Sequence, residues 1–550
     1  MLGIISFVGF TLLVAVISYL ATRKTDENSS DGYFLGGRSL TAPVIAGSLL
    51  LTNLSTEQIV GLNGQSYTEG IVVMAWETLA AIAMVVTAIF LLPRYLKGGI
   101  TTVPQFLKDR YDVTTKTLTS ALFLTGYVVV LLPTILYSGA LAISTMFDIP
   151  AMLDVSGTAA LVICIWGIGI IGSIYAVFGG LKAVAVSDTI NAIGLLIGGL
   201  LIPIFGLMAI GDGSVFGGLS VLYEANPEKF DSTGDITNSV PFSTLFTGMM
   251  LINLFYWGTN QQIIQRALGA KNLAEGQKGL LLASFIKILG PLIVVLPGII
   301  AFHYFKGGLE MPDQAYPALV NAVLPKYFVG FFVAVLFGAI LSSFNSVLNS
   351  SVTLFGLDIY KQHVNPEASE RTVVKYGKIF GIVLAIGAML IAPLIANAGS
   401  LFEYLQEVNG IYSIPIFTII VVGYLTKRVP AIAAKIGIIS GSVLYIISQF
   451  VLKPNLVESA LEKAAAAGVT DERALALVEA KAYPHFIHVM AILFVLNMVI
   501  MLVIGKIWPN KEPFELKYTE QVSIEPYKYV KQVGLLVCAI VIGLYVYFAR

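Results

Sequence analysis

The 550-residue chain has little of what a soluble enzyme needs. It contains two cysteines, four histidines and only 12% charged residues, whereas a soluble domain carries about a quarter charged residues. Neither Cys164 nor Cys538 has a metal-ligand neighbour, which argues against a disulfide framework and a zinc site. No His, Cys or Ser/His constellation supports catalysis. We therefore expect a protein that is not an enzyme and that has no cofactor.

Apolar residues are what the chain has in abundance. Hydrophobic residues make up 57% of it, and the mean hydropathy is +0.84. A run of 18 or more mostly apolar residues is long enough to cross a bilayer. The sequence contains about fourteen such spans and no linker between domains, which predicts an all-α polytopic membrane protein with a single domain over residues 1–550.

The distribution of the basic residues predicts the orientation. With the N-terminus outside, most Lys and Arg fall in inner loops, as the positive-inside rule requires. An even number of spans returns the C-terminus to the outside. We expect a multi-pass protein of the cell (inner) membrane with both termini outside the cytoplasm, and an outer loop at 453–483 that forms two short polar helices.

Two of the spans are interrupted by polar residues. The span at 40–64 is broken by the polar segment 52–58, and the span at 243–264 is broken between Asn253 and Gln262. Backbone groups in a bilayer must be satisfied internally, so such breaks are tolerated only where they line a cavity or bind something. Two interrupted spans at matching places in two halves indicate a secondary transporter with its site at the midplane.

Several ionisable residues lie at membrane depth, where a charge normally faces a cavity or a partner. These candidates are Glu57, Glu77, Asp188, Lys287, Glu403 and Glu407. Asp188 and the two last glutamates lie nearer to span ends, where contact with water would explain them. Lys287 is flanked by apolar turns, so we expect a binding site or a structural ion pair; the alternative is that it reaches the inner surface.

Two further groups of residues suit a solute and an ion. Asn253, Tyr256 and Asn260 are spaced to share one helix face, where amides and an aromatic ring could hold a sugar or simply pack between helices. The adjacent hydroxyls of Ser342 and Ser343 could allow close helix packing or bind a hard cation, which prefers oxygen ligands. The break would free the carbonyls of Leu51 and Leu54 to supply the other oxygens.

Five segments carry a family resemblance. They are YFLGGRSL at 33–40, NLSTEQ at 53–58, YAVFGGLKA at 175–183, and the segments 253–266 and 339–350. With these five segments in this order, the chain resembles the solute:sodium symporter family over nearly its whole length. Within that family it is most similar to the bacterial sodium/sugar branch, which includes the sodium/galactose symporter. The resemblance implies a ten-helix inverted-repeat core (5+5) at 40–426, with discontinuous first and sixth core helices. A leading helix and loop at 1–39 and three trailing helices at 427–550 complete the chain.

The resemblance also implies roles for individual residues. The sodium ligands would be the carbonyls of Leu51, Leu54 and Ala339 and the hydroxyls of Ser342 and Ser343. Asp188 matches an acidic residue on the sodium release path. The sugar would be bound by Gln58, Glu77, Asn253, Lys287 and Gln406, and Tyr256 matches an aromatic residue that closes the sugar site from the inside. Ala80 and Leu131 stand where the galactose symporter has polar residues, so a sugar or polyol is implied but galactose itself is not.

The expected function is therefore sodium-coupled symport of a hexose-like sugar into the cell by alternating access, in which ion and sugar each favour the binding of the other. The partners would be sodium, the sugar and the lipid bilayer, with no nucleic acid and no obligate protein partner. One alternative is a symporter for sialic acid, inositol or an organic acid. Another is a sensor of the same fold, but a sensor should carry a soluble signalling domain, and we expect none, because the chain ends in one short helix at Arg550.

Overall fold

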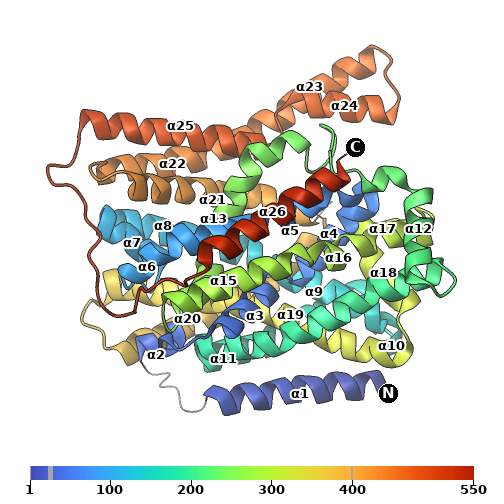
Figure 1. The fold of residues 1–550 in the computed structure, drawn as a ribbon, viewed down its shortest axis with the longest axis horizontal. Helices are drawn as coiled ribbons and strands as arrows, with labels where there is room; N and C mark the ends of the chain where they lie inside the picture. Colours follow the sequence, from blue (N-terminus) through green and yellow to red (C-terminus); the bar gives the residue numbers. More distant parts are fainter. Residues whose placement is uncertain (1, 23–28, 398–400, 550) are drawn as a thin grey trace.

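The structure, a computed structural model, describes residues 2–22, 29–397 and 401–549. In these ranges nearly all of the regular structure is helical, and the β-type contact that they contain is an isolated parallel bridge between Leu40 and Ala270. Most of the long helices run roughly in one direction, which is horizontal in Figure 1. The prediction of an all-α protein is thereby confirmed.

The first half of the chain supplies twelve helices. They are α1 (Leu2–Thr22), α2 (Ser30–Leu35), α3 (Ala42–Asn53), α4 (Thr56–Glu69), α5 (Ala75–Val86), α6 (Leu92–Lys97), α7 (Val103–Arg110), α8 (Val113–Gly126), α9 (Leu132–Phe147), α10 (Ile149–Leu153), α11 (Gly157–Ile210) and α12 (Val215–Ala225). Short π-type turns join α5 to α6 and α8 to α9.

The second half supplies the rest. They are α13 (Gly248–Gly258), α14 (Gln261–Leu268), α15 (Leu273–Ile288), α16 (Gly290–Val294), α17 (Leu296–Tyr304), α18 (Ala315–Val323), α19 (Lys326–Thr353), α20 (Glu370–Ile391), α21 (Leu401–Leu425), α22 (Ala431–Ile447), α23 (Lys453–Ala466), α24 (Glu472–Ala482), α25 (Phe486–Ile507) and α26 (Val530–Phe548).

By length and composition, ten helices in the described ranges can cross a membrane, or eleven when α15 and the helices after it are counted as one span bent by 48°. The prediction of about fourteen spans counts each interrupted helix as one crossing. The count of ten or eleven includes only continuous helices of at least 18 residues. The pieces of an interrupted helix can be shorter than that, as the twelve-residue α3 is. The higher count therefore stays a prediction.

The outer surface of the bundle is apolar. Leu12, Leu390 and Leu535 are 59%, 62% and 72% exposed and lie on three different helices. An aqueous protein rarely exposes so much contiguous apolar surface, whereas lipid tails solvate it. The span that contains α19 is buried over 94% of its most apolar window, against 17% for α26. Thus α19 is central and α26 is peripheral.

The two chain ends and one helical hairpin lie at the same end of the bundle (Figure 1). Both chain termini lie at one end of the bundle, as an even number of crossings requires, and the α23–α24 hairpin projects at the same end (Figure 1). These two helices occupy the predicted loop 453–483. The loop after α12 packs near this end too, where Lys229 Nζ donates to the carbonyl of Tyr67 at 3.1 Å.

A glycine makes the turn between α4 and α5 possible. Gly70 has φ +81°, a left-handed value that favours glycine, and an added Cβ would lie 2.4 Å from the Lys229 carbonyl oxygen. The chain can therefore reverse direction tightly under the loop that carries Lys229. This turn sets α5 beside α13 and α15, the helices that carry the candidate solute residues.

Candidate functional site

The first interrupted span breaks where the polar residues predict it. Helix α3 ends at Asn53, Leu54 leaves the helical conformation (φ −75°, ψ 58°), and the extended Ser55 precedes α4. The Ser55 N–H donates to the Asn53 carbonyl at 2.8 Å, although in an unbroken helix it would donate to Leu51. The Leu51 carbonyl thus lacks the partner it would have in a continuous helix.

The second interrupted span breaks at Thr259 and Asn260. Asn260 is extended, and its side chain accepts a hydrogen bond from the N–H of Gln262, so that it caps α14. The Tyr127 hydroxyl donates to the same Asn260 oxygen at 2.5 Å. The prediction that Asn260 continues the helix face of Asn253 and Tyr256 is wrong, because α13 has already ended. All three residues nevertheless line one cavity.

This cavity lies between the two breaks and the helices α5, α21 and α25. Its lining combines amides, one carboxylate and several aromatic rings. The lining residues are Asn53, Glu57, Gln58, Trp76, Leu131, Ile252, Asn253, Phe255, Tyr256, Trp257, Asn260, Gln262, Phe402, Leu405, Gln406, Asn409, Tyr412, Ser413 and Met490. Amides that can bond hydroxyls and rings that can cover C–H faces give the cavity the chemistry of a site for a small polar solute.

Four of the predicted solute residues line this cavity: Gln58, Asn253, Tyr256 and Gln406. The Asn253 amide donates to the Met249 carbonyl at 3.1 Å within its own helix. The Gln406 oxygen accepts from the Asn409 amide at 3.5 Å. The structure therefore gathers residues that are up to about 350 positions apart in the sequence around one space.

Glu77 and Lys287, also predicted to bind the solute, lie behind the wall instead. Neither side chain is exposed, and the Lys287 ammonium pairs with one carboxylate oxygen of Glu77. The other oxygen accepts from the Gln58 amide at 2.7 Å. Lys287 Nζ also lies 5.7 Å from the ring centroid of Trp257, which lines the cavity. This is the structural ion pair that the sequence left open, and it orients Gln58 and Trp257.

One of the residues predicted to hold sodium contacts the first break. Ser343 of α19 donates to the carbonyl of Thr52 at 3.1 Å, and the Thr52 and Ser346 hydroxyls are hydrogen-bonded at 3.0 Å. Ala339 and Ser342 are buried on the same helix. The Ser342 hydroxyl has no hydrogen-bond partner among the described residues. The contact thus joins the end of α3 to a helix with adjacent hydroxyls, an oxygen-rich setting that suits a hard cation.

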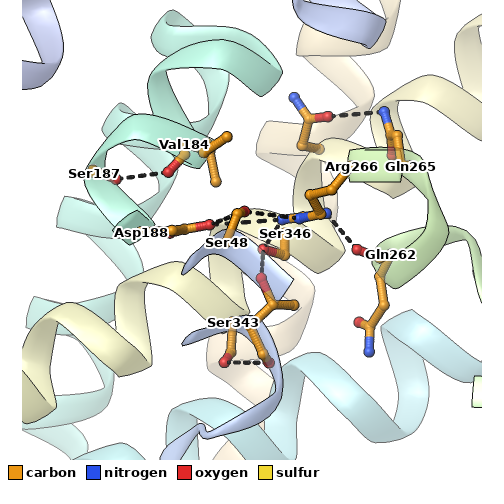
Figure 2. A network of polar contacts seen from close by, with 12 residues as sticks. Ser48, Val184, Ser187, Asp188, Gln262, Gln265, Arg266, Ser343 and Ser346 are labelled. Atoms are coloured by element: carbon orange, nitrogen blue, oxygen red, sulfur yellow. Dashed lines mark hydrogen bonds and ion pairs between the residues drawn. The ribbon is translucent and has the colours of Figure 1, made fainter. Parts of the chain in front are cut away.

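A buried polar network extends from this contact to Asp188 of α11 (Figure 2). Asp188 accepts from the Ser48 hydroxyl at 2.6 Å and lies 4.0 Å from the Arg266 guanidinium. Arg266 donates to Ser48 at 3.2 Å and also to Ser346 and the carbonyl of Gln262. Neither charged side chain is exposed. The expectation that Asp188 lies near water is wrong, because four helices enclose it.

Comparison with known sequences identifies the chain. The sequence model described as "Sodium:solute symporter family" matches residues 33–441, well over half of the chain. The chain belongs to the sodium:solute symporter family. It is therefore a multi-pass membrane transporter that couples the movement of a small solute to sodium, and it is not an enzyme.

Two relatives of the symporter cover most of its length. It is 47% identical to the "Uncharacterized symporter YidK" of Escherichia coli K12 over 545 residues, which are 99% of this chain and 90% of that protein. It is 33% identical to the "Sodium/glucose cotransporter" of Vibrio parahaemolyticus over 467 residues, 80% of this chain and 84% of that one.

A solved structure supports the fold of the symporter. A sodium-coupled sialic acid symporter in a substrate-bound outward-open state superposes with a TM-score of 0.69, over 90% of this chain and 98% of that one. At 20% identity the likeness supports the fold alone.

Some residues of the symporter site had no specific sequence signal. Arg266 looks like one of the many basic residues near a span end, and its burial could have been read only from its apolar neighbours Ile263, Ile264, Ala267 and Leu268. Of the two positions that depart from the galactose symporter, Leu131 lines the cavity, whereas Ala80 is buried outside the lining.

Proposed function

We propose that this symporter takes up a hexose-like sugar or a related polyol, driven by sodium. The observation that carries the proposal is the cavity between the two helix breaks, which presents the amides of Gln58, Asn253, Gln406 and Asn409 beside aromatic rings. Amides offer both donors and acceptors to hydroxyl groups, and rings cover the apolar faces of a sugar. The printed name of the Vibrio relative, a sodium/glucose cotransporter, supports the same substrate class.

The proposed sodium ligands are the carbonyls of Leu51, Leu54 and Ala339 and the hydroxyls of Ser342 and Ser343. Sodium would replace the hydrogen bond from Ser343 to the Thr52 carbonyl and hold α3 against α19. Because Asn53, at the end of α3, also lines the solute cavity, a change at the ion site is transmitted directly to the cavity. Each ligand then favours the other by the same factor.

The Asp188–Arg266 network supports a role for Asp188 in sodium release. It ties α14, α3, α11 and α19 together next to the proposed ligands. For the ion to leave past Asp188, these contacts would have to separate. We propose that their separation accompanies the opening toward the cytoplasm in an alternating-access cycle with a 5+5 core.

We further propose fourteen crossings in the cell (inner) membrane, with both termini and the α23–α24 hairpin outside. The support is the excess of Lys and Arg in the loops at the opposite end of the bundle.

The test is uptake of labelled hexoses and polyols into proteoliposomes under an inward sodium gradient, with a potassium gradient of equal size as the control. We expect accumulation with sodium alone. Equal uptake in both gradients would contradict the proposed coupling, and sodium-driven uptake of a different solute class would contradict the sugar.

A further inference from the structure

One acidic side chain of the cavity has an oxygen without a hydrogen-bond partner among the described residues. Glu57 lies in the first turn of α4, immediately after the helix break, and it lines the solute cavity. Its side chain is 6% exposed, and its Oε2 atom has no hydrogen-bond partner among the described residues. The Ser55 side chain and the Glu57 backbone N–H bond this carboxylate, which leaves Oε2 as the oxygen that a solute hydroxyl or amine could bond. A buried acceptor without a donor is costly, so a ligand that supplies a proton to Oε2 would be favoured.

The same wall holds other acceptors that lack a donor. Asn53 Oδ1 and Gln262 Oε1 are buried and also have no hydrogen-bond partner in the described part of the chain. The Tyr256 hydroxyl lies beside both amides, but with one proton it can satisfy only one oxygen. Turning an amide over exchanges its oxygen for its nitrogen. When Glu57 is ionised it has only acceptors in any orientation, so in that state it needs a donor from the solute.

The protein offers Glu57 no positive charge. Among the described residues that line the cavity, none is Lys, Arg or His. The two buried cations nearby are already engaged, since Lys287 pairs with Glu77 and Arg266 binds Ser48, Ser346 and the carbonyl of Gln262. When Glu57 is ionised, its charge therefore has no cation in the described lining of the cavity to compensate it.

We infer that Glu57 is a specificity-determining residue that selects solutes with a proton to donate and no negative charge, and that rejects carboxylates. A hydroxyl donated to Glu57 forms a charge-assisted hydrogen bond. A solute carboxylate at the same place would set two like charges together away from water, and specificity is built by such repulsion as much as by attraction. This inference rests on the proposed function of the cavity as the solute site, and it decides between the neutral and the acidic solutes that the family transports.

The experiment compares matched pairs of solutes that differ by one carboxylate. Binding of glucose against glucuronate, and of galactose against galacturonate, is titrated on the purified full-length protein in sodium. The readout is intrinsic fluorescence, because Trp76 and Trp257, two of the four tryptophans, line the cavity. myo-Inositol, a primary amine and sialic acid complete the panel, and sodium-driven uptake into proteoliposomes repeats the comparison.

In the wild type we expect the neutral member of a pair to bind at least tenfold more tightly than its acid. Glu57→Gln removes the charge and should reduce that ratio at least threefold, whereas Glu57→Asp keeps the charge and should preserve it. A ratio near one in the wild type, or an unchanged ratio in Glu57→Gln, would overturn the inference. If Glu57→Gln is not recovered as folded protein, the inference is tested by the affinity ratio of the wild type and by that of Glu57→Asp. A ratio near one in either protein would overturn it.

The outcomes separate this inference from the proposed sugar. Sodium-driven uptake of the amine, without uptake of any hexose or of myo-inositol, would end the proposal of a sugar or polyol and support the selection by Glu57. Equal binding and equal sodium-driven uptake of a hexose and its uronate would support the sugar proposal and end the selection by Glu57. Sodium-driven uptake of sialic acid alone would contradict both.

Discussion

Lys287 and Glu77 lie 210 positions apart in the sequence and form an ion pair in which neither side chain is exposed. The second oxygen of Glu77 holds the amide of Gln58, which lines the cavity. The pair therefore links α15 and α5 to the wall of the solute site without reaching into the space itself. In this structure the pair supports the wall of the cavity, and direct contact of Glu77 and Lys287 with solute stays a prediction.

Lys287→Met should destabilise the protein as well as impair uptake. Removing one partner of a buried pair leaves an uncompensated charge and typically costs about 3–5 kcal/mol. The matched control is Lys278→Met on the same helix, where the lysine is 44% exposed and pairs with Glu275 at 3.2 Å. An exposed pair contributes roughly 0–1 kcal/mol. Thermal unfolding of the two purified variants measures the loss of stability in each. Equal losses in Lys287→Met and Lys278→Met would contradict the structural role of Lys287.

Ser343→Ala should weaken activation by sodium. The hydroxyl is a proposed ligand and now bonds the Thr52 carbonyl. We expect the sodium concentration for half-maximal uptake to rise about tenfold, which corresponds to about 1.4 kcal/mol. Ser351→Ala is the control, because that buried hydroxyl of α19 bonds the Val347 carbonyl of its own helix. If sodium activation is the same in Ser343→Ala as in the wild type, the serine is not a ligand.

Arg266→Lys should be poorly tolerated although it conserves the charge. The guanidinium donates to Ser48, Ser346 and the Gln262 carbonyl at once, and one ammonium cannot reproduce this planar array. With buried acceptors left unpaired, we expect a loss of about 2–4 kcal/mol in unfolding free energy. Arg94→Lys, at an exposed arginine that donates to the Phe90 carbonyl and lies 5.5 Å from the Tyr424 ring centroid, should change it by less than about 0.5 kcal/mol. Similar melting temperatures for the two variants would argue against the network.

The Tyr127–Asn260 contact should show energetic coupling. Asn260 caps α14 and accepts from the Tyr127 hydroxyl. Asn260→Ala removes the cap and leaves the Tyr127 O–H without its acceptor, although the Gln262 N–H still donates to the tyrosine oxygen at 3.3 Å, so we expect a loss of about 1–3 kcal/mol. Tyr127→Phe in the same background should then cost less than it does in the wild type. Thermal unfolding of the four proteins in this cycle gives the coupling, and strict additivity would mean that the contact contributes nothing.

The proposed orientation can be checked with single cysteines. Cys164 and Cys538 are replaced by serine, and Ala467→Cys in the α23–α24 hairpin or Lys511→Cys after α25 is introduced; both positions are exposed. In intact cells a membrane-impermeant maleimide should label position 467 and not position 511. The reverse pattern would invert the topology. Labelling of both positions after cell lysis controls for accessibility.

The sequence by itself determined the membrane class, the all-helical architecture and the positions of the two breaks. These features follow from local chemistry, since a long apolar run must span a bilayer and a polar break at membrane depth must line a cavity or a ligand. The break at Leu54 and Ser55 lies within the predicted segment for this reason. The family resemblance likewise pointed to Gln58, Asn253, Tyr256 and Gln406, which line the cavity.

Only the tertiary structure decided which charges meet. Whether Lys287 reaches solute, water or a carboxylate depends on how α15 packs against α5, and spacing along the sequence carries no record of that. Arg266 is buried because α3, α11 and α19 converge on it, and the same convergence leaves Glu57 without a cation. In a bilayer, where water cannot screen or hydrate a charge, these long-range pairings set the role of each ionisable residue.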